Sequence, residues 1–197
     1  RLIDSLTRYG AKTVVFDILF AESSSEDEDW ALADSITLND TVVLVNEINI
    51  VDDPQFGYQL EKVVDPKPIL KFLDKPPRVG YANVELDPDG FVRRLKTSKA
   101  GEQALSVQVL RHAQPVSERI IPQEALINFI GPKRTIKSIS YYQALEHAKF
   151  LPENFLRNKI VFVGFSTLAQ ARVDSSQPDH FPVPFTHWTG GYMPGVE

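Results

Sequence analysis

An aspartate inside a run of apolar residues is the first candidate for chemistry. Asp17 interrupts the segment Thr13–Phe20, which is otherwise rich in Val, Ile, Leu and Phe. An unpaired carboxylate is costly to bury, so we expect Asp17 near the end of a strand, facing a ligand, a cation or backbone donors. A structural carboxylate at the start of the acidic segment 22–29 fits equally well. Phosphatase chemistry through an aspartyl phosphate would need a second acid two residues later, where Leu19 stands.

Arg93 is a second candidate, because a planar guanidinium suits a carboxylate or an anionic ligand. If Phe91–Leu95 is a strand, the side chain of Arg93 shares one face with Phe91 and Leu95, and an inward apolar face would carry Arg93 inward. The alternative is an internal salt bridge to one of three aspartates, Asp17, Asp87 or Asp89.

No complete catalytic or cofactor motif accompanies these residues. The sequence after Gly164 lacks the second glycine and the Gly-Lys-Ser or Gly-Lys-Thr of a phosphate-binding loop. The four histidines match no zinc spacing, there is no cysteine, and no Gly-x-Ser-x-Gly is present. We therefore expect a chain that is not an enzyme and that holds no cofactor and no metal.

Composition narrows the class of protein. The chain has 197 residues, 43% of them apolar and 24% charged, which is ordinary for a globular domain with one sizeable core. A net charge of −5 without a dense basic surface argues against nucleic acid as a partner. The longest apolar runs fall far short of the roughly 20 residues of a membrane span. The absence of cysteine leaves a periplasmic location open.

Helical and strand patterns alternate along the chain. Apolar spacing predicts helices near 2–9, 30–36, 104–113 and 141–148 and strands near 13–20, 41–48, 125–130 and 159–164. This alternation predicts an α/β fold with a mostly parallel or mixed central sheet flanked by helices.

Two further segments depart from that alternation. Asp87-Pro88-Asp89-Gly90 predicts a turn that joins segments 79–84 and 91–95 as an inserted antiparallel hairpin. A short helix is expected within 69–73, and residues 166–195 predict a long irregular C-terminal loop. We expect a single domain spanning residues 1–197.

The chain resembles the CHASE domain of the second type, an extracellular sensor associated with cyclases and histidine kinases. The blocks that carry the resemblance occur in the family's order: Phe16-Asp17-Ile18-Leu19-Phe20, Gly80-Tyr81-Ala82-Asn83, Asp87-Pro88-Asp89-Gly90-Phe91-Val92-Arg93-Arg94, Ile127-Asn128-Phe129-Ile130-Gly131-Pro132, Asn158-Lys159-Ile160-Val161-Phe162-Val163-Gly164, Asp179-His180-Phe181-Pro182 and Met193-Pro194-Gly195-Val196-Glu197. Val183 stands where the family pattern expects Thr, and either Asp174 or Asp179 aligns with the family's late acid.

The resemblance implies a piece of a larger membrane receptor, truncated at both ends. It implies that this domain lies in the periplasm or outside the cell, anchored in the inner membrane by transmembrane helices beyond the sequence. It also implies a cytoplasmic output such as an adenylate cyclase, a diguanylate cyclase or a two-component kinase.

The hypothesis from the sequence is a sensory domain that binds a small polar or anionic ligand and passes on a conformational change. Its ligand site is expected at Asp17, Asn83 and Arg93, with Asn128, Lys159 and Asp179 as additional positions taken from the resemblance. The alternatives are a module for homodimerisation or partner binding without a small ligand, and a hydrolase that uses Asp17 or Asp179.

Overall fold

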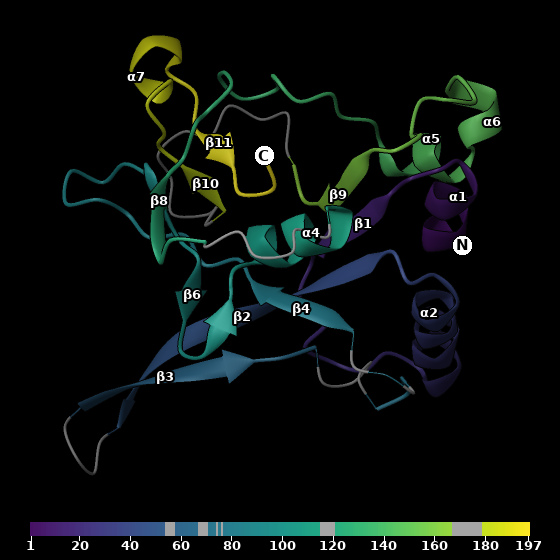
Figure 1. Ribbon diagram of the computed structural model, residues 1–197, viewed down its shortest axis with the longest axis horizontal. Coiled ribbons are helices and arrows are strands. Elements are labelled where there is room, and N and C mark those ends of the chain that lie inside the picture. Colours follow the sequence, from purple (N-terminus) through teal and green to yellow (C-terminus); the bar gives the residue numbers. More distant parts are fainter. Residues whose placement is uncertain (54–57, 67–70, 74, 76, 115–120, 167–178) are drawn as a thin grey trace.

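Four parallel strands form the centre of the molecule (Figure 1). The computed structural model describes residues 1–53, 58–66, 71–73, 75, 77–114, 121–166 and 179–197. The parallel strands lie in the order β9 (Ile160–Gly164), β1 (Thr13–Asp17), β2 (Val42–Asp53) and β4 (Arg78–Tyr81). The second half of β2, from Glu47 onward, pairs antiparallel with β3 (Tyr58–Val64), which makes the sheet mixed.

Helices cover both faces of this sheet because successive side chains of a strand point to opposite faces. Val14 and Phe16 of β1 pack in the core under α1 (Leu2–Arg8), α2 (Glu26–Leu38) and α5 (Tyr141–Leu145). Val15 packs on the other face against α4 (Leu105–Ala113). The sheet is therefore the middle layer of three.

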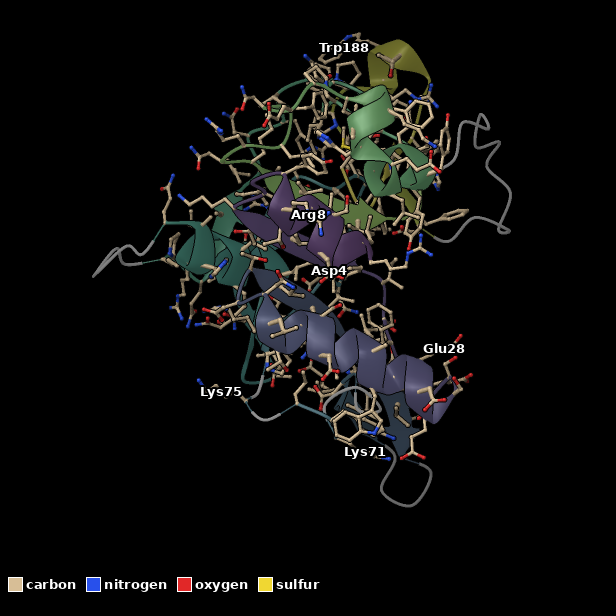
Figure 2. The ribbon with its side chains drawn as sticks, turned by 90° about the vertical axis from the view of Figure 1, so that its right-hand side faces the viewer. Asp4, Arg8, Glu28, Lys71, Lys75 and Trp188 are labelled. Carbon is tan, nitrogen blue, oxygen red and sulfur yellow. The ribbon has the colours of Figure 1, made fainter. Side chains whose placement is uncertain are left out.

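The two N-terminal helices lie side by side on their face of the sheet (Figure 2). The carboxylate of Asp4 on α1 accepts hydrogen bonds from Ser35 Oγ at 3.3 Å and from Asn39 Nδ2 at 3.2 Å. Helix α2 begins after Ser25, whose hydroxyl accepts from the Glu28 N–H at 3.4 Å. The four acidic residues of its first turn favour that start through the helix dipole.

A smaller layer lies at the carboxyl ends of the parallel strands, and we call it the cap (residues 84–96, 121–130 and 179–197). It contains β5 (Arg94–Lys96) paired with β8 (Glu124–Leu126), β10 (His180–Phe181) paired with β11 (Met193–Pro194), and α7 (Thr186–Thr189). Its own core consists of Val92, Val183 and Met193. The Val92 N–H donates to Pro182 O at 2.8 Å, which ties the two halves of the cap together. A short hairpin of β6 (Ser98–Lys99) and β7 (Glu102–Gln103) then leads into α4.

The predicted fold class is confirmed, and the differences are local. Strand β1 ends at Asp17 and not at Phe20, and β2 runs on to Asp53 because it gains β3 as a partner. The helix expected over 141–148 is split into α5 and α6 (His147–Phe150) at Glu146. The short helix expected within 69–73 lies partly outside the described residues, and so does much of the predicted C-terminal loop.

The predicted turn at Asp87–Gly90 forms, but the segments on either side of it do not pair with each other. Gly90 adopts the positive φ of 81° that the turn requires, and its N–H donates to Asp87 O at 2.8 Å. Residues 78–81 instead join the parallel sheet beside β2, and residues 94–96 pair with β8. Pairing with the buried sheet gives Val79 and Tyr81 more apolar contact than an isolated hairpin could provide.

Within the part of the chain that the structure describes, no helix is long and apolar enough to cross a membrane.

Candidate functional site

The carboxyl ends of the parallel strands gather the polar residues into one region. Strand β1 ends at Asp17 and β9 ends at Gly164, and these two residues are direct partners across the sheet. From β1 the chain proceeds to β2 and β4 on one side, whereas β9 lies on the other side of β1. Asp17 therefore stands at the switch point of the strand order, where open α/β sheets form ligand crevices.

The Asp17 carboxyl group is half-buried and is held near a second acid. Burial raises the pKa of Asp17 above its ordinary value, and the nearby charge of Asp179 raises that pKa further. Within the described residues, no hydrogen bond or ion pair offsets this cost. A desolvated carboxylate at a strand end is stabilised when a hydrogen-bond donor or a cation binds to it.

The second acid, Asp179, reaches the same region from the cap. Burial raises the pKa of Asp179, while the neighbouring His180 acts weakly in the opposite direction. The Asp179 carboxylate lies directly against Gly195, where any side chain would overlap it. The Gly195 N–H also donates to Asp179 O at 3.1 Å. Asp174, the alternative to Asp179 in the resemblance, lies outside the described residues.

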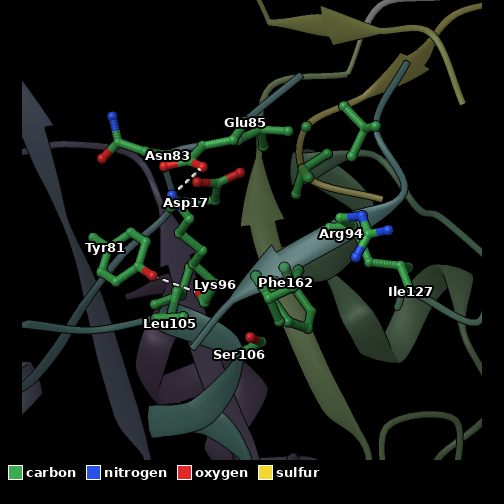
Figure 3. A pocket seen from close by; sticks show the side chains of 17 residues that line it. Asp17, Tyr81, Asn83, Glu85, Arg94, Lys96, Leu105, Ser106, Ile127 and Phe162 are labelled. Atoms are coloured by element: carbon green, nitrogen blue, oxygen red, sulfur yellow. Dashed lines mark hydrogen bonds and ion pairs between the residues drawn. The ribbon is translucent and has the colours of Figure 1, made fainter. Parts of the chain in front are cut away.

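Two cavities meet at Asp17. The larger, of about 440 Å³, lies between β1, β2, the segment after β4 and the cap, and its lining consists of Asp17, Leu19, Val45, Asn46, Glu47, Ala82, Asn83, Val84, Asp179 and Phe181. The smaller, of about 180 Å³, lies under β5 and is seen in Figure 3, with Asp17 and Asn83 on one side and Arg94 and Ile127 on the other.

Of the basic residues that the structure describes, Arg94 and Lys96 line the smaller cavity and none lines the larger, and both already have acidic partners. Lys96 Nζ lies 2.7 Å from Glu85 Oε2, and Arg94 Nη1 lies 2.7 Å from Glu124 Oε1. The remaining walls are largely apolar and include Leu105 and Phe162. An entering anion would therefore compete with existing ion pairs.

A buried amide adds a polar group to the larger cavity. Asn46 on β2 is 1% exposed. Its Nδ2 is directed at Glu102 Oε2, 3.3 Å away, and at Asp65 Oδ1, 3.5 Å away. Its Oδ1 has no hydrogen-bond partner within the described residues. Asn46 escaped the sequence prediction, although, like Asp17, it is a polar residue that interrupts an apolar strand.

Asn83 lies at the predicted region but has a structural role there. Its Oδ1 accepts from the Ile48 N–H at 2.7 Å and its Nδ2 donates to Ile48 O at 3.0 Å. The side chain thus replaces a strand partner for β2 just beyond the end of β4. Its remaining edge lines both cavities beside Asp17.

Arg93 does not line either cavity at Asp17, and the internal salt bridge is what the structure contains. Its guanidinium donates to Asp89 through two hydrogen bonds of 2.8 Å and to Asp87 at 2.9 Å. The segment 91–93 is not a strand, so the face-sharing argument for Arg93 does not apply. The side chain, 37% exposed, packs over Phe91 at 4.9 Å from the ring centre. The structure instead puts Arg94 next to Asp17's smaller cavity.

Two additional predicted positions lie elsewhere. Asn128 lines a separate cavity of about 250 Å³ between the segment 127–136 and Met193 of β11. Lys159 is exposed, lies 4.5 Å from the centre of the Phe155 ring, and borders a cavity of about 370 Å³. Of the six predicted residues, the structure therefore brings Asp17, Asn83 and Asp179 together.

The last residues of the sequence lie against this site. A side chain at position 164 would meet Val196 Cγ2 at 2.6 Å, so Val196 packs directly on Gly164, the partner of Asp17. A carboxylate oxygen of Glu197 accepts a hydrogen bond from the Arg134 N–H at 2.6 Å. Residues 195 and 196 therefore contact both Asp179 and the strand partner of Asp17.

Within the described ranges, no group of three or more His, Cys, Asp or Glu side chains could hold a metal ion. A family model described as the CHASE2 domain matches residues 1–197, the whole chain. No curated protein and no solved structure matches it.

Proposed function

Because the chain belongs to the CHASE2 domain family, a family of extracellular sensory domains, we propose that it senses a small polar molecule at the Asp17 edge of its sheet. In this proposal the domain lies in the periplasm or outside the cell and is anchored in the inner membrane through helices beyond the present sequence. Ligand binding shifts the domain between two conformations, and the shift reaches a cytoplasmic adenylate cyclase, diguanylate cyclase or kinase.

The observation that carries the proposal is the position of Asp17. A desolvated carboxylate stands at the switch point of the strand order, and two cavities open on it. Such crevices are where open α/β sheets bind their ligands. A buried polar group that has no hydrogen-bond partner within the described protein strengthens ligand binding when the ligand donates a hydrogen bond to it.

The contact between this edge and residues 195–197 supports a relay. Gly195 touches the Asp179 carboxylate and Val196 touches Gly164, so the C-terminal segment packs directly against the edge that forms the ligand site. A ligand shifts an equilibrium only if it binds one conformation more tightly than the other. We propose that the two conformations differ in how residues 195–197 pack against this edge.

A thermal-shift screen of small metabolites tests the proposal, since a ligand that binds the folded state raises Tm. We expect one or more polar compounds to raise Tm of the wild type and of Arg93→Ala, and to lose their effect in Asp17→Asn. The proposal fails if no compound raises Tm, or if every compound acts equally on Asp17→Asn. An Arg93→Ala variant that loses the response would return Arg93 to the site.

A second candidate, homodimerisation without a small ligand, is favoured by the apolar surface of β9. Ile160 and Phe162 on this edge strand are 43% and 46% exposed. Ile136, which lines the same cavity as Ile160 and Phe162, is exposed as well. Exposed apolar edges are typical of interfaces. Sedimentation should then show a concentration-dependent dimer that Phe162→Glu dissociates; a monomer at all concentrations removes this candidate.

The hydrolase alternative has less support. Asp17 and Asp179 share a cavity, but no hydrogen bond joins them within the described residues, and the family is sensory and not catalytic. Acid–base chemistry would need two groups within hydrogen-bond reach of one another or of the substrate.

A further inference from the structure

We propose that the cavity at Asp17 and Asp179 binds a small organic ammonium ion, a protonated primary amine with an apolar body. This inference rests on the sensory function proposed above and names the chemical class of its ligand. Three features of the cavity support this inference: residues with oxygen acceptors, the negative charge of its lining and the apolar side chains of its walls.

Three groups offer oxygen atoms to the cavity. They are Asp17 and Asp179, which carry carboxylates, and Asn46, whose side-chain amide is buried at the cavity wall. A primary ammonium has three N–H donors and no acceptor, which matches a set of three oxygens. Hydrogen bonds between an ammonium and carboxylates are also charge-assisted, and therefore among the stronger ones in proteins.

Asn46 is the independent indication that a donor is missing. At 1% exposure its amide is removed from bulk water, and its Oδ1 has no partner within the described residues. The Asp65 and Glu102 carboxylates fix its orientation, because only the amide nitrogen can donate to them. A buried acceptor left in this way is destabilising unless a ligand or a water donates to it.

The charges around the cavity select a cation. Among the residues that the structure describes, its charged lining residues are Asp17, Glu47 and Asp179, with no Lys, Arg or His. His180, beside Asp179, is the basic residue whose charge reaches this group. An anion would meet two carboxylates whose pKa values are already raised by burial. A cation would relieve that cost.

The apolar side chains that line the cavity favour an organic cation over a metal ion. Leu19, Val45, Val84 and Phe181 supply apolar surface for a carbon skeleton. The volume of about 440 Å³ falls within the range of roughly 300–1,000 Å³ typical of small-molecule sites. A metal would need more acidic or histidine ligands than the described part of the molecule brings together.

Thermal-shift titrations with simple probes test the inference. At pH 7.5 and constant ionic strength, n-butylammonium and 1,4-butanediammonium are compared with n-butanol, butyrate, CaCl₂ and MgCl₂. We expect one or both ammonium probes to raise Tm, and the apparent affinity to fall at least tenfold in Asp17→Asn and in Asp179→Asn. Asp34→Asn, on the exposed face of α2, is the matched control and should keep the full response.

Each other outcome overturns the inference. An equal shift by n-butanol would mean apolar binding only, and a shift by CaCl₂ or MgCl₂ that depends on Asp17 would mean a metal site. A shift by butyrate that depends on Asp17 would leave the sensory site standing with an anionic ligand. No shift by either ammonium probe removes the ammonium class, while the metabolite screen decides separately whether a ligand site exists.

Each shift is measured against the ligand-free Tm of the same variant, because Asp17→Asn changes the stability itself. If Asp179→Asn fails to fold, Asp17→Asn alone decides the outcome.

Discussion

Two of the acidic clusters in the described part of this molecule, one in the turn at Asp87–Gly90 and one at the strand ends, lie in opposite environments. In the turn, Asp87 and Asp89 share the guanidinium of Arg93, and this partner holds the pKa of Asp89 below its ordinary value. At the strand ends, Asp17 and Asp179 have no such cation within the described residues, and burial raises both pKa values. The two clusters use the same type of residue for different purposes.

This contrast separates acidic residues that stabilise the fold from acidic residues that are candidates for ligand binding. The turn satisfies its own charges, so it needs nothing from outside and fixes the entry into β5. The edge at Asp17 leaves polar groups desolvated at a cavity, which lowers stability unless something binds there. Clusters of the second kind are candidates for ligand sites.

The largest loss of stability should come from truncating a side chain in the apolar core. Its size gives the reference for a purely structural change. Leu44→Ala, at a fully buried position of β2, should lower the free energy of unfolding by about 2–5 kcal/mol. Leu86→Ala, at a position that is 56% exposed, is the matched control and should cost below about 0.5 kcal/mol. Urea unfolding measures both, and equal costs would contradict the assignment of the core.

Asp17→Asn should change the free energy of unfolding in the opposite direction and stabilise the protein at neutral pH. We expect a gain of about 0.5–2 kcal/mol, which is common when a residue kept for function is replaced. Because the folded pKa is raised, the native state holds its proton longer than the unfolded chain, and the wild type loses stability as pH rises above about 4. The gain should therefore vanish near pH 3. Urea unfolding of Asp17→Asn and Asp34→Asn across pH checks this, and a destabilised Asp17→Asn would mean that Asp17 has a structural partner.

His147 tests whether desolvation alone marks a site, since it lies away from both cavities at Asp17. It is 1% exposed, stacks on Tyr9 with ring centres 3.7 Å apart, and burial lowers its pKa. The unfolded chain then takes up a proton first, so stability should fall as pH drops below about 6.5. His147→Phe should remove this dependence, a change of a few degrees at most in Tm. An unchanged pH profile in His147→Phe would assign the dependence to other groups.

The smallest effect is expected from Arg93→Ala. Its ion pair with Asp89 is exposed and its ion pair with Asp87 is partly buried, and such pairs near the surface contribute little and are screened by salt. We expect a slight fall in Tm that disappears at high salt, with the ligand response intact. A fall as large as that of Leu44→Ala would show that the turn organises the whole cap.

Much of the fold was accessible from the sequence because its signals are local. The alternation of helices with apolar runs predicted the parallel sheet, and the interrupted run at Asp17 pointed to its carboxyl edge. Glycine and proline at Asp87–Gly90 predicted the turn for the same reason. The partners of 79–84 and 91–95 could not be predicted, because strand pairing is decided by tertiary contacts.

The candidate site could be predicted from the sequence only in part. The sequence left two alternatives for Arg93, an inward side chain facing a ligand or an internal salt bridge, and the structure contains the salt bridge with Asp87 and Asp89. Asn46 was missed because a sequence does not reveal that an amide oxygen lacks a partner. Asp179 came from the family resemblance alone, since its neighbours in the sequence give no periodic signal.

One measurement tests the comparison most directly: the pH titration of the individual carboxyl groups by ¹³C NMR, with and without n-butylammonium. We expect the pKa values of Asp17 and Asp179 to lie above the ordinary aspartate range and to fall when the probe binds. We expect the pKa of Asp89 to lie below that range in both conditions. An Asp17 that titrates like an exposed aspartate, or that ignores every ligand found in the screen, would contradict the assignment of the site.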